Sequence, residues 1–165
     1  MQLKPITPII VLLLVIASIS VAGCSPPIAS PSPSPTAIAT VSVTATYLGS
    51  SNSLTSYGTP TAAASGNKFV TYAVYLQNIN AKDKMMGNPL DFKLRDTEGN
   101  LYSYDVSGYS VKQQVNGRML EGITGQMNTQ AGDKYSGIIA FQIPTSATPK
   151  SLTYDDYTNK ITINL

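Results

Sequence analysis

The chain has 165 residues, a formal net charge of +2 and only 12% charged side chains, and it contains one cysteine and no histidine. The absence of histidine excludes Ser-His-Asp and Cys-His catalysis and zinc sites with histidine ligands. Because the charge is near neutral and no basic cluster occurs, we expect no nucleic-acid partner.

The first 24 residues have the three parts of a secretory signal. Lys4 supplies a positive charge, residues 6–21 form an uncharged apolar run, and Val21-Ala22-Gly23-Cys24 follows. This tetrapeptide resembles the lipobox of prokaryotic lipoproteins. The resemblance implies that residues 1–23 are a signal peptide and that Val21, Ala22 and Gly23 are recognised by the signal peptidase. It also implies that Cys24 carries a diacylglyceryl anchor on the outer face of the cytoplasmic membrane.

Two alternatives to lipidation remain open. The first is an uncleaved membrane anchor, but the apolar run would cover about 24 Å as a helix, short of a hydrocarbon core of about 30 Å. The second is that Cys24 is a chance thiol, against which its position at the cleavage point argues. We therefore expect membrane lipid as a partner through Cys24.

Residues 24–40 are predicted to be the lipidated cysteine and a flexible stalk rich in proline and serine. Five of the eleven prolines lie between residues 25 and 36. Proline fixes φ and removes a hydrogen-bond donor, so this stretch favours extended polyproline II structure. It would reach about 40–50 Å from the bilayer. A plain spacer is favoured over a glycosylated stalk.

From residue 41 onward the hydrophobic pattern alternates with a period of two, which predicts β-strands. The first strand covers residues 41–47, and a loop is expected over residues 49–66. The next strand, 68–78, is apolar on both phases, as expected for a central position. Leu90, Phe92 and Leu94 alternate with polar residues in a strand ending at residue 96. A tight turn with Gly99 then leads to a partner strand over residues 101–104.

The second half has three further predicted strands, after a stretch over residues 105–130 without a clear pattern. They cover residues 134–144, 151–154 and 160–165. In the first of these, one phase should face the core and the other should face outward or towards a covered edge. The inward residues are Ile139, Phe141 and Ile143, and the outward ones are Ser136, Ile138, Ala140 and Gln142.

Seven or eight short strands without an amphipathic helix predict an all-β fold over residues 41–165, an antiparallel immunoglobulin-like β-sandwich. Three sequence blocks also resemble the DUF4352 family of immunoglobulin-like lipoprotein domains, whose fold is similar to that of the MPT63 secreted antigen. The blocks are residues 66–78, 92–102 and 131–144, followed by Leu152-Thr153-Tyr154. The family has no assigned activity, so the resemblance implies an architecture and a location only.

Carboxylates are the remaining candidates for catalysis or metal binding. Asp91, Asp96 and Glu98 lie near one hairpin, and Asp155 and Asp156 are adjacent. Adjacent strand residues point to opposite faces, so Asp155 and Asp156 make a poor acid/base pair unless they sit in a turn. Residues 96–100 have oxygens at alternate positions, but they lack the further acids of a calcium loop. For all of these carboxylates a structural role in a turn is favoured, and no metal or cofactor is expected.

Tyrosines supply a candidate binding face. Tyr102, Tyr104 and Tyr109 lie in the hairpin and the loop after it, and tyrosine suits adaptable binding surfaces. The alternative is ordinary sheet packing, which the β-propensity of tyrosine favours. Met85-Met86 would add an adaptable apolar patch or pack locally.

The sequence therefore predicts a membrane-anchored, extracytoplasmic module that binds or scaffolds and does not catalyse. Its partner would be a cell-envelope protein or ligand. The first alternative is a small-ligand or ion-binding accessory lipoprotein of a transporter, which a concave pocket with converging polar groups would favour. A carboxylate-dependent hydrolase is the least favoured alternative.

Overall fold

The computed structural model describes residues 40–165. The predicted signal peptide, its recognition residues Val21, Ala22 and Gly23, and Cys24 lie outside the described residues, as does the stalk up to residue 39. The predictions made for them stay predictions. Within residues 40–165, no helix has the length and apolarity that crossing a bilayer requires.

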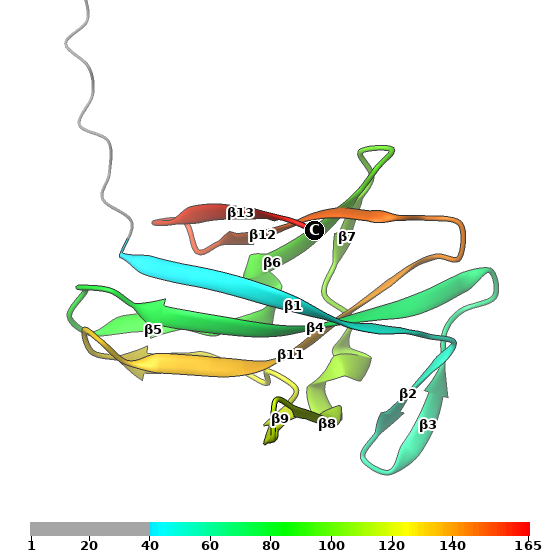
Figure 1. Ribbon diagram of the computed structural model, residues 1–165, viewed down its shortest axis with the longest axis horizontal. Coiled ribbons are helices and arrows are strands. Elements are labelled where there is room, and N and C mark those ends of the chain that lie inside the picture. Colours follow the sequence, from blue (N-terminus) through cyan, green and yellow to red (C-terminus); the bar gives the residue numbers. More distant parts are fainter. Residues whose placement is uncertain (1–39) are drawn as a thin grey trace, which may run out of the picture. The chain divides into compact units, whose positions relative to one another are not determined.

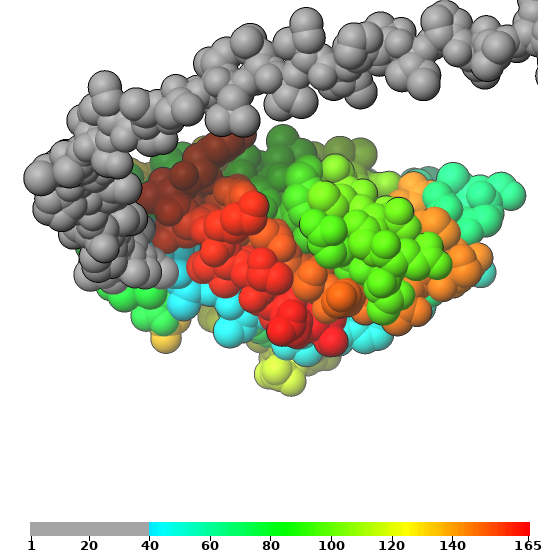
Figure 2. Space-filling view, turned by 90° about the horizontal axis from the view of Figure 1, so that it is seen from above, coloured from blue at the N-terminus to red at the C-terminus, as the bar shows by residue number. Residues whose placement is uncertain are grey.

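Two antiparallel sheets form the body of the fold (Figure 1). The three-stranded sheet has the order β1 (Val41–Ser51), β4 (Asn67–Asn78), β11 (Lys134–Pro144). The four-stranded sheet has the order β13 (Lys160–Asn164), β12 (Pro149–Asp155), β6 (Phe92–Asp96), β7 (Leu101–Ser103). In Figure 2 the orange β12 lies between the red β13 and the green β6–β7 region. These are the seven strands that the alternation predicts, and the immunoglobulin-like β-sandwich is confirmed.

Two regions contain hairpins that were not predicted from the sequence. The predicted loop 49–66 contains a hairpin of β2 (Ser53–Ser56) and β3 (Thr59–Ala62), joined by Tyr57 and Gly58 with φ of 51° and 79°. The unassigned stretch after residue 105 contains a hairpin of β8 (Lys112–Val115) and β9 (Arg118–Glu121). Its turn is Asn116-Gly117, with φ of 51° and 78°. Both turns use two positive φ values, which match the twist of a two-residue hairpin.

Three short elements and one further strand complete the structure. They are the 3-10 helix η1 (Pro89–Asp91), the 3-10 helix η2 (Val106–Ser110), and β5 (Lys84–Met86), which pairs with β10 (Met127–Thr129). The helix η1 corrects one prediction. Leu90 was expected to lie in one strand with Phe92 and Leu94, but residues 89–91 form η1 instead and Leu90 is 59% exposed.

The main core lies between the two sheets. The phase predicted for β11 is confirmed, since Ile139, Phe141 and Ile143 are fully buried there. The other members of this core include Tyr72, Val74 and Leu76 from β4, Phe92 and Leu94 from β6, and Leu152 and Tyr154 from β12. Burial of these side chains is the main source of stability, because the free energy of folding follows the apolar area removed from water.

A second, smaller core covers part of the opposite face of the three-stranded sheet. Phe69, Ala73, Ile138 and Ala140 point away from the main core but are buried under β2, η2 and the β8–β9 hairpin. The covering elements contribute Leu54, Val111, Val115 and Leu120. The central strand β4 is therefore apolar on both phases because its two faces meet two different cores.

Candidate binding surface

The second core stops halfway along the outer face of the three-stranded sheet. Side chains alternate between faces along a strand, so the even-numbered residues of β1 and β11 and the odd-numbered residues of β4 share this outer face. On β4, Phe69 and Ala73 are buried in the second core. Tyr75 packs against the edge of that core, and Tyr75 and Gln77 are partly exposed. The uncovered half forms an open depression of about 760 Å³.

The strand register arranges the floor of this depression in two rows. Thr44, Tyr75 and Ser136 are direct cross-strand neighbours and form the first row. Ser42, Gln77 and Lys134 form the second. Side chains directly opposite one another on a sheet have Cβ atoms about 4.5–5.5 Å apart. The floor is therefore one aromatic ring surrounded by three hydroxyl groups, one amide and one ammonium group.

Two short hairpin strands supply the remaining wall of the depression. Arg118 follows the Asn116-Gly117 turn at the start of β9, and Met127 begins β10. Both side chains are largely exposed. The positive φ values of Asn116 and Gly117 reverse the chain so that Arg118 comes next to the depression.

The depression is lined by two charged side chains, and both are positive. Arg118 and Lys134 belong to the lining, and no aspartate or glutamate does. The ion pairs within residues 40–165 involve three other lysines, Lys84, Lys112 and Lys160. Asp133 precedes Lys134, but its carboxylate accepts a hydrogen bond from the backbone N–H of Gln130 at 2.8 Å and so closes a turn. The depression therefore favours a ligand with negative charge.

The three tyrosines predicted as a binding face do not share one exposed surface. Tyr104 is 7% exposed and packs in the main core, with its ring 5.3 Å from that of Tyr109. The Tyr102 hydroxyl donates a hydrogen bond to Asp96 Oδ2 at 2.7 Å. Burial raises the pKa of Tyr104. The alternative of sheet packing fits Tyr102 and Tyr104. Tyr75 is not predicted as a binding residue because the sequence of its strand is typical of a central strand.

Tyr109 also lines a second hollow, of about 520 Å³, beside the tip of the β2–β3 hairpin. Tyr57 and Ser110 contribute to its lining. Its two charged residues, Lys112 and Glu121, pair with each other at 2.6 Å. Because this pair is neutral overall, the second hollow has no charge preference comparable to that of the first.

The turn after β6 uses its carboxylate for structure, as favoured from the sequence. Asp96 is 1% exposed and accepts hydrogen bonds from the backbone N–H groups of Glu98 and Asn100. The hydrogen bond from Tyr102 and those from Asn100 and Glu98 lower the pKa of Asp96 to about 2, against the effect of burial. Its oxygens are thus occupied by donors. Within residues 40–165, no group of three or more acidic or cysteine residues has the arrangement of a metal site.

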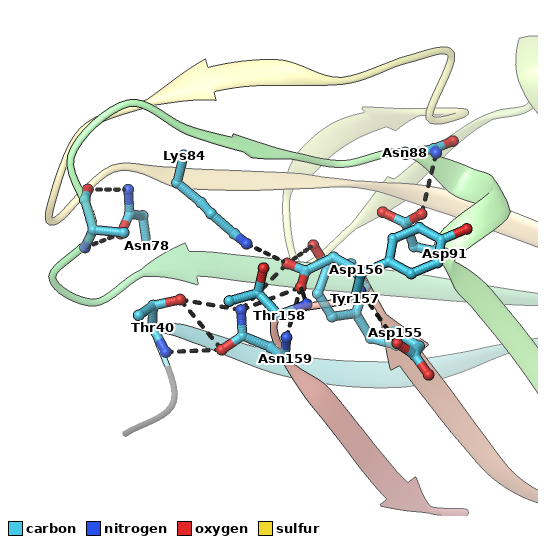
Figure 3. A network of polar contacts seen from close by, with 12 residues as sticks. Thr40, Asn78, Lys84, Asn88, Asp91, Asp155, Asp156, Tyr157, Thr158 and Asn159 are labelled. Atoms are coloured by element: carbon cyan, nitrogen blue, oxygen red, sulfur yellow. Dashed lines mark hydrogen bonds and ion pairs between the residues drawn. The ribbon is translucent and has the colours of Figure 1, made fainter. Parts of the chain in front are cut away.

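The carboxylates of Asp155 and Asp156 point apart and pair with different lysines (Figure 3). Asp155 is the last residue of β12 and Asp156 begins the turn that follows, so strand alternation does not decide their arrangement. Asp156 lies 2.9 Å from Lys84 Nζ, and these side chains are only 6% and 14% exposed. Asp155 instead faces Lys160, at 3.4 Å on the surface. Burial opposes ionisation of Asp156, but hydrogen bonds from Lys84, from the backbone of residues 158 and 159 and from Tyr154 hold its pKa below the ordinary value. This arrangement is a structural ion pair and offers no acid/base couple.

The same network holds the first described residue of the domain (Figure 3). The Asn159 side chain accepts a hydrogen bond from the backbone N–H of Thr40 at 2.8 Å and is 6% exposed. Asp91 lies beside this network, and its pKa is raised to about 6 by burial and then by the negative charges of Asp156 and Asp155. Asp156 accepts hydrogen bonds from Asn159, and Asn159 in turn fastens the start of β1.

Comparisons with known proteins agree with the three sequence blocks. The family model DUF4352, described as a domain of unknown function, matches residues 35–162. Among solved structures, the chain is similar to MPT63, described as a secreted protein from Mycobacterium tuberculosis, with 13% sequence identity and a TM-score of 0.40. That similarity covers 76% of this chain and 85% of the other. No curated protein matches the chain.

Proposed function

Because the chain belongs to the DUF4352 family, whose description assigns no activity, we propose its function from its own residues: a lipid-anchored, extracytoplasmic module that binds a cell-envelope partner without catalysis. The observation that carries the binding role is the depression on the three-stranded sheet. The outer face of this sheet continues past the second core, and there its side chains are polar and accessible instead of apolar and covered. Within this polar half, the partly exposed ring of Tyr75 and the two cations Arg118 and Lys134 are the features that support a binding role.

Anchoring is supported by the residues that precede the domain. The apolar run ends in Val21-Ala22-Gly23-Cys24, and a proline-rich stretch separates Cys24 from Thr40. Two acyl chains give stable attachment, whereas a single chain holds a protein only marginally. A diacylglyceryl group on Cys24 would therefore retain the domain at the outer face of the membrane.

The test of anchoring is the intact mass of the full-length protein extracted from membranes. We expect a mature species that begins at Cys24 and carries the diacylglyceryl mass, and a Cys24→Ser variant without either change. A mature protein with an unmodified Cys24, or one that retains residues 1–23, would contradict the anchoring proposal.

A large or extended partner suits the depression better than an enclosed small ligand. The cavity is open to one side, and its floor consists of three strands that no further element covers. An open floor leaves much of a small ligand in water, whereas small-molecule sites bury most of their ligand. This favours an interaction module over an accessory protein for a small solute.

The depression can be blocked with one substitution and a matched control. Thr44→Trp places a large side chain over the first row, and Thr162→Trp places the same residue on the exposed face of β13 in the other sheet. Both threonines are exposed strand residues. The envelope fragments are first freed of lipid with a non-ionic detergent, which is also present in the assay, so that the proposed Cys24 anchor does not hold the protein to them. We expect the full-length protein to be retained by these fragments of the producing cell. Thr44→Trp should weaken this retention, and Thr162→Trp should leave it unchanged.

Equal retention of both variants and the wild type would show that the depression is not the binding surface. Loss of retention in both variants would show that the outer face of β13 contributes equally and would also contradict the assignment. The measurement is the fraction of protein that sediments with the fragments over a range of fragment concentrations.

A small-ligand role is the second candidate, favoured by the hollow between the β2–β3 hairpin and η2. Tyr57, Tyr109 and Ser110 converge on it. If this hollow were the functional site, Ser110→Leu would abolish ligand-dependent thermal stabilisation of the protein, while Thr44→Trp would leave that stabilisation unchanged.

A further inference from the structure

We infer that the partner of the depression is an anionic polysaccharide. This inference rests on the proposed function and adds the chemical class of the ligand. It follows from three properties of the lining that occur together: two cations without a carboxylate, one flat aromatic ring, and hydroxyl and amide groups on both sides of that ring.

The cations determine the sign of the ligand's charge. Lys134 ends the second row of the floor, and Arg118 stands on the neighbouring hairpin wall. Both side chains are largely exposed, so they remain hydrated and lose little on meeting an anion. Their attraction acts across the depression but is screened within about 8–10 Å at physiological salt. A repeating anion that touches both groups gains more than a single carboxylate does.

The first row matches the shape of a sugar ring. Tyr75 lies between Thr44 and Ser136 in register, so its ring has a hydroxyl group on each side. An aromatic ring offers a flat apolar surface for the C–H face of a sugar, and the flanking hydroxyls both donate and accept hydrogen bonds. Gln77 in the next row adds two N–H donors and one carbonyl acceptor.

Other polyanions fit the lining less well. Single-stranded nucleic acid stacks successive bases on several aromatic side chains. The lining includes two tyrosines, but Tyr135 belongs to the inner phase of β11 and packs against the main core, so only Tyr75 points outward from the floor. An acidic protein would bury an apolar centre surrounded by polar groups, whereas here the centre is made of hydroxyl and amide groups. The single exposed Met127 at the wall does not replace such a centre.

The test uses the full-length protein, purified from membranes in a non-ionic detergent, and two forms of one polymer. Polygalacturonate carries a carboxylate on each sugar, and its fully methyl-esterified form has the same chain without charge. We expect the charged form to bind at least about tenfold more tightly by biolayer interferometry. The difference should shrink as NaCl rises from about 50 to about 500 mM, because exposed charges are screened. Polyphosphate, which has charge without sugar, should bind more weakly than polygalacturonate.

Neutral substitutions of the two cations locate the effect. Arg118→Gln and Lys134→Gln should each weaken binding of polygalacturonate about threefold to fivefold, the range of an exposed charge contact. Lys150→Gln removes an exposed lysine from β12, in the other sheet, and should leave binding unchanged. Binding of the methyl-esterified polymer should not respond to any of the three substitutions.

The inference is wrong if both forms of the polymer bind equally, if polyphosphate binds as tightly as polygalacturonate, or if Lys150→Gln weakens binding as much as Arg118→Gln. Each of these results leaves the envelope-fragment test intact, because Thr44→Trp reports on the depression whatever its ligand. Conversely, equal retention of Thr44→Trp and Thr162→Trp on envelope fragments would remove the proposed function itself.

Discussion

The two faces of the three-stranded sheet have different surroundings although the same strands build both. On the inner face, Tyr72, Ile139 and Phe141 are completely buried against the second sheet. On the outer face, Ile138 and Ala140 are equally buried under the β8–β9 hairpin and η2. Two residues earlier on β11, Ser136 lies in the open depression.

This difference shows how a strand can serve stability and binding along one phase. The outer phase of β11 is apolar where a hairpin covers it and polar where nothing does. On β4 the change falls between Ala73 and Tyr75. A one-residue slip in register would exchange the two faces of the sheet. It would expose core residues and bury the polar residues of the depression, so both faces fix the register between β4 and β11. Substitutions on the two faces test which residues of these strands face a core and which face the depression. The largest loss of stability is expected on the inner face.

Phe141→Ala should have the largest effect, because Phe141 is completely buried in the main core and its ring packs 6.3 Å from that of Tyr72. The lost contacts and the remaining cavity should lower the free energy of unfolding by about 3–5 kcal/mol. Urea unfolding followed by circular dichroism measures this change. A loss below about 1 kcal/mol would mean that β11 does not face the main core with this phase.

Ile138→Ala tests the second core. Ile138 is also completely buried, but its cover is a small two-stranded hairpin that can move inward to fill part of the cavity. We expect a loss of about 2–4 kcal/mol in the same urea experiment, smaller than that of Phe141→Ala. A loss as small as that of an exposed residue would show that the β8–β9 hairpin does not cover this face in solution.

Gln142→Ala probes the same phase two residues past Ala140. From the sequence, Gln142 was expected to face outward as an ordinary surface residue. Its amide instead donates to Asp105 Oδ2 at 3.1 Å and accepts a hydrogen bond from the backbone N–H of Ala64. We therefore expect a loss of about 1 kcal/mol, typical of an intramolecular hydrogen bond. Retention of wild-type stability would indicate that these bonds exchange freely with water.

The sequence predicts the main strands because most of them alternate in hydrophobicity, and β1, β4, β6, β11 and β12 carry buried apolar residues. The short strand β7 has no buried residue and is predicted from the Gly99 turn that precedes it. It does not predict the second core, since the covering hairpins are short and polar at most positions. The Asn116-Gly117 turn was an available signal for β8–β9, because Asn-Gly strongly favours a two-residue hairpin. The depression escaped prediction for a different reason. Tyr75 belongs to it only because Thr44 and Ser136 are its cross-strand neighbours, and register between distant strands is not visible in the chain.

The two cores are apolar, so the dependence of stability on pH must come from carboxyl groups outside them, and between about pH 4 and about pH 6 it should come from Asp91. The pKa of Asp91 is raised to about 6 by burial and by Asp156 and Asp155. A carboxyl group whose pKa is higher in the folded state binds more protons there, so stability falls as pH rises between about 4 and about 6. Asp91→Asn should therefore raise the melting temperature at pH 7.5 and have little effect at pH 4. An effect that is equal at both pH values would contradict the burial of Asp91.

Thr44→Trp should have the smallest effect on stability, although it should have the largest effect on binding. Thr44 is exposed in the open half of the outer face, and the depression of about 760 Å³ leaves room for an indole ring. Substitutions at exposed positions usually change the free energy of unfolding by less than about 0.5 kcal/mol.

The control adds bulk to the covered half of the same face. Ala140→Leu should lower the free energy of unfolding by about 1–3 kcal/mol, because Ala140 is completely buried. Urea midpoints of the two variants measure this contrast directly. Similar losses in both would mean that the outer face is covered along its whole length, and the depression would then not be available to any partner.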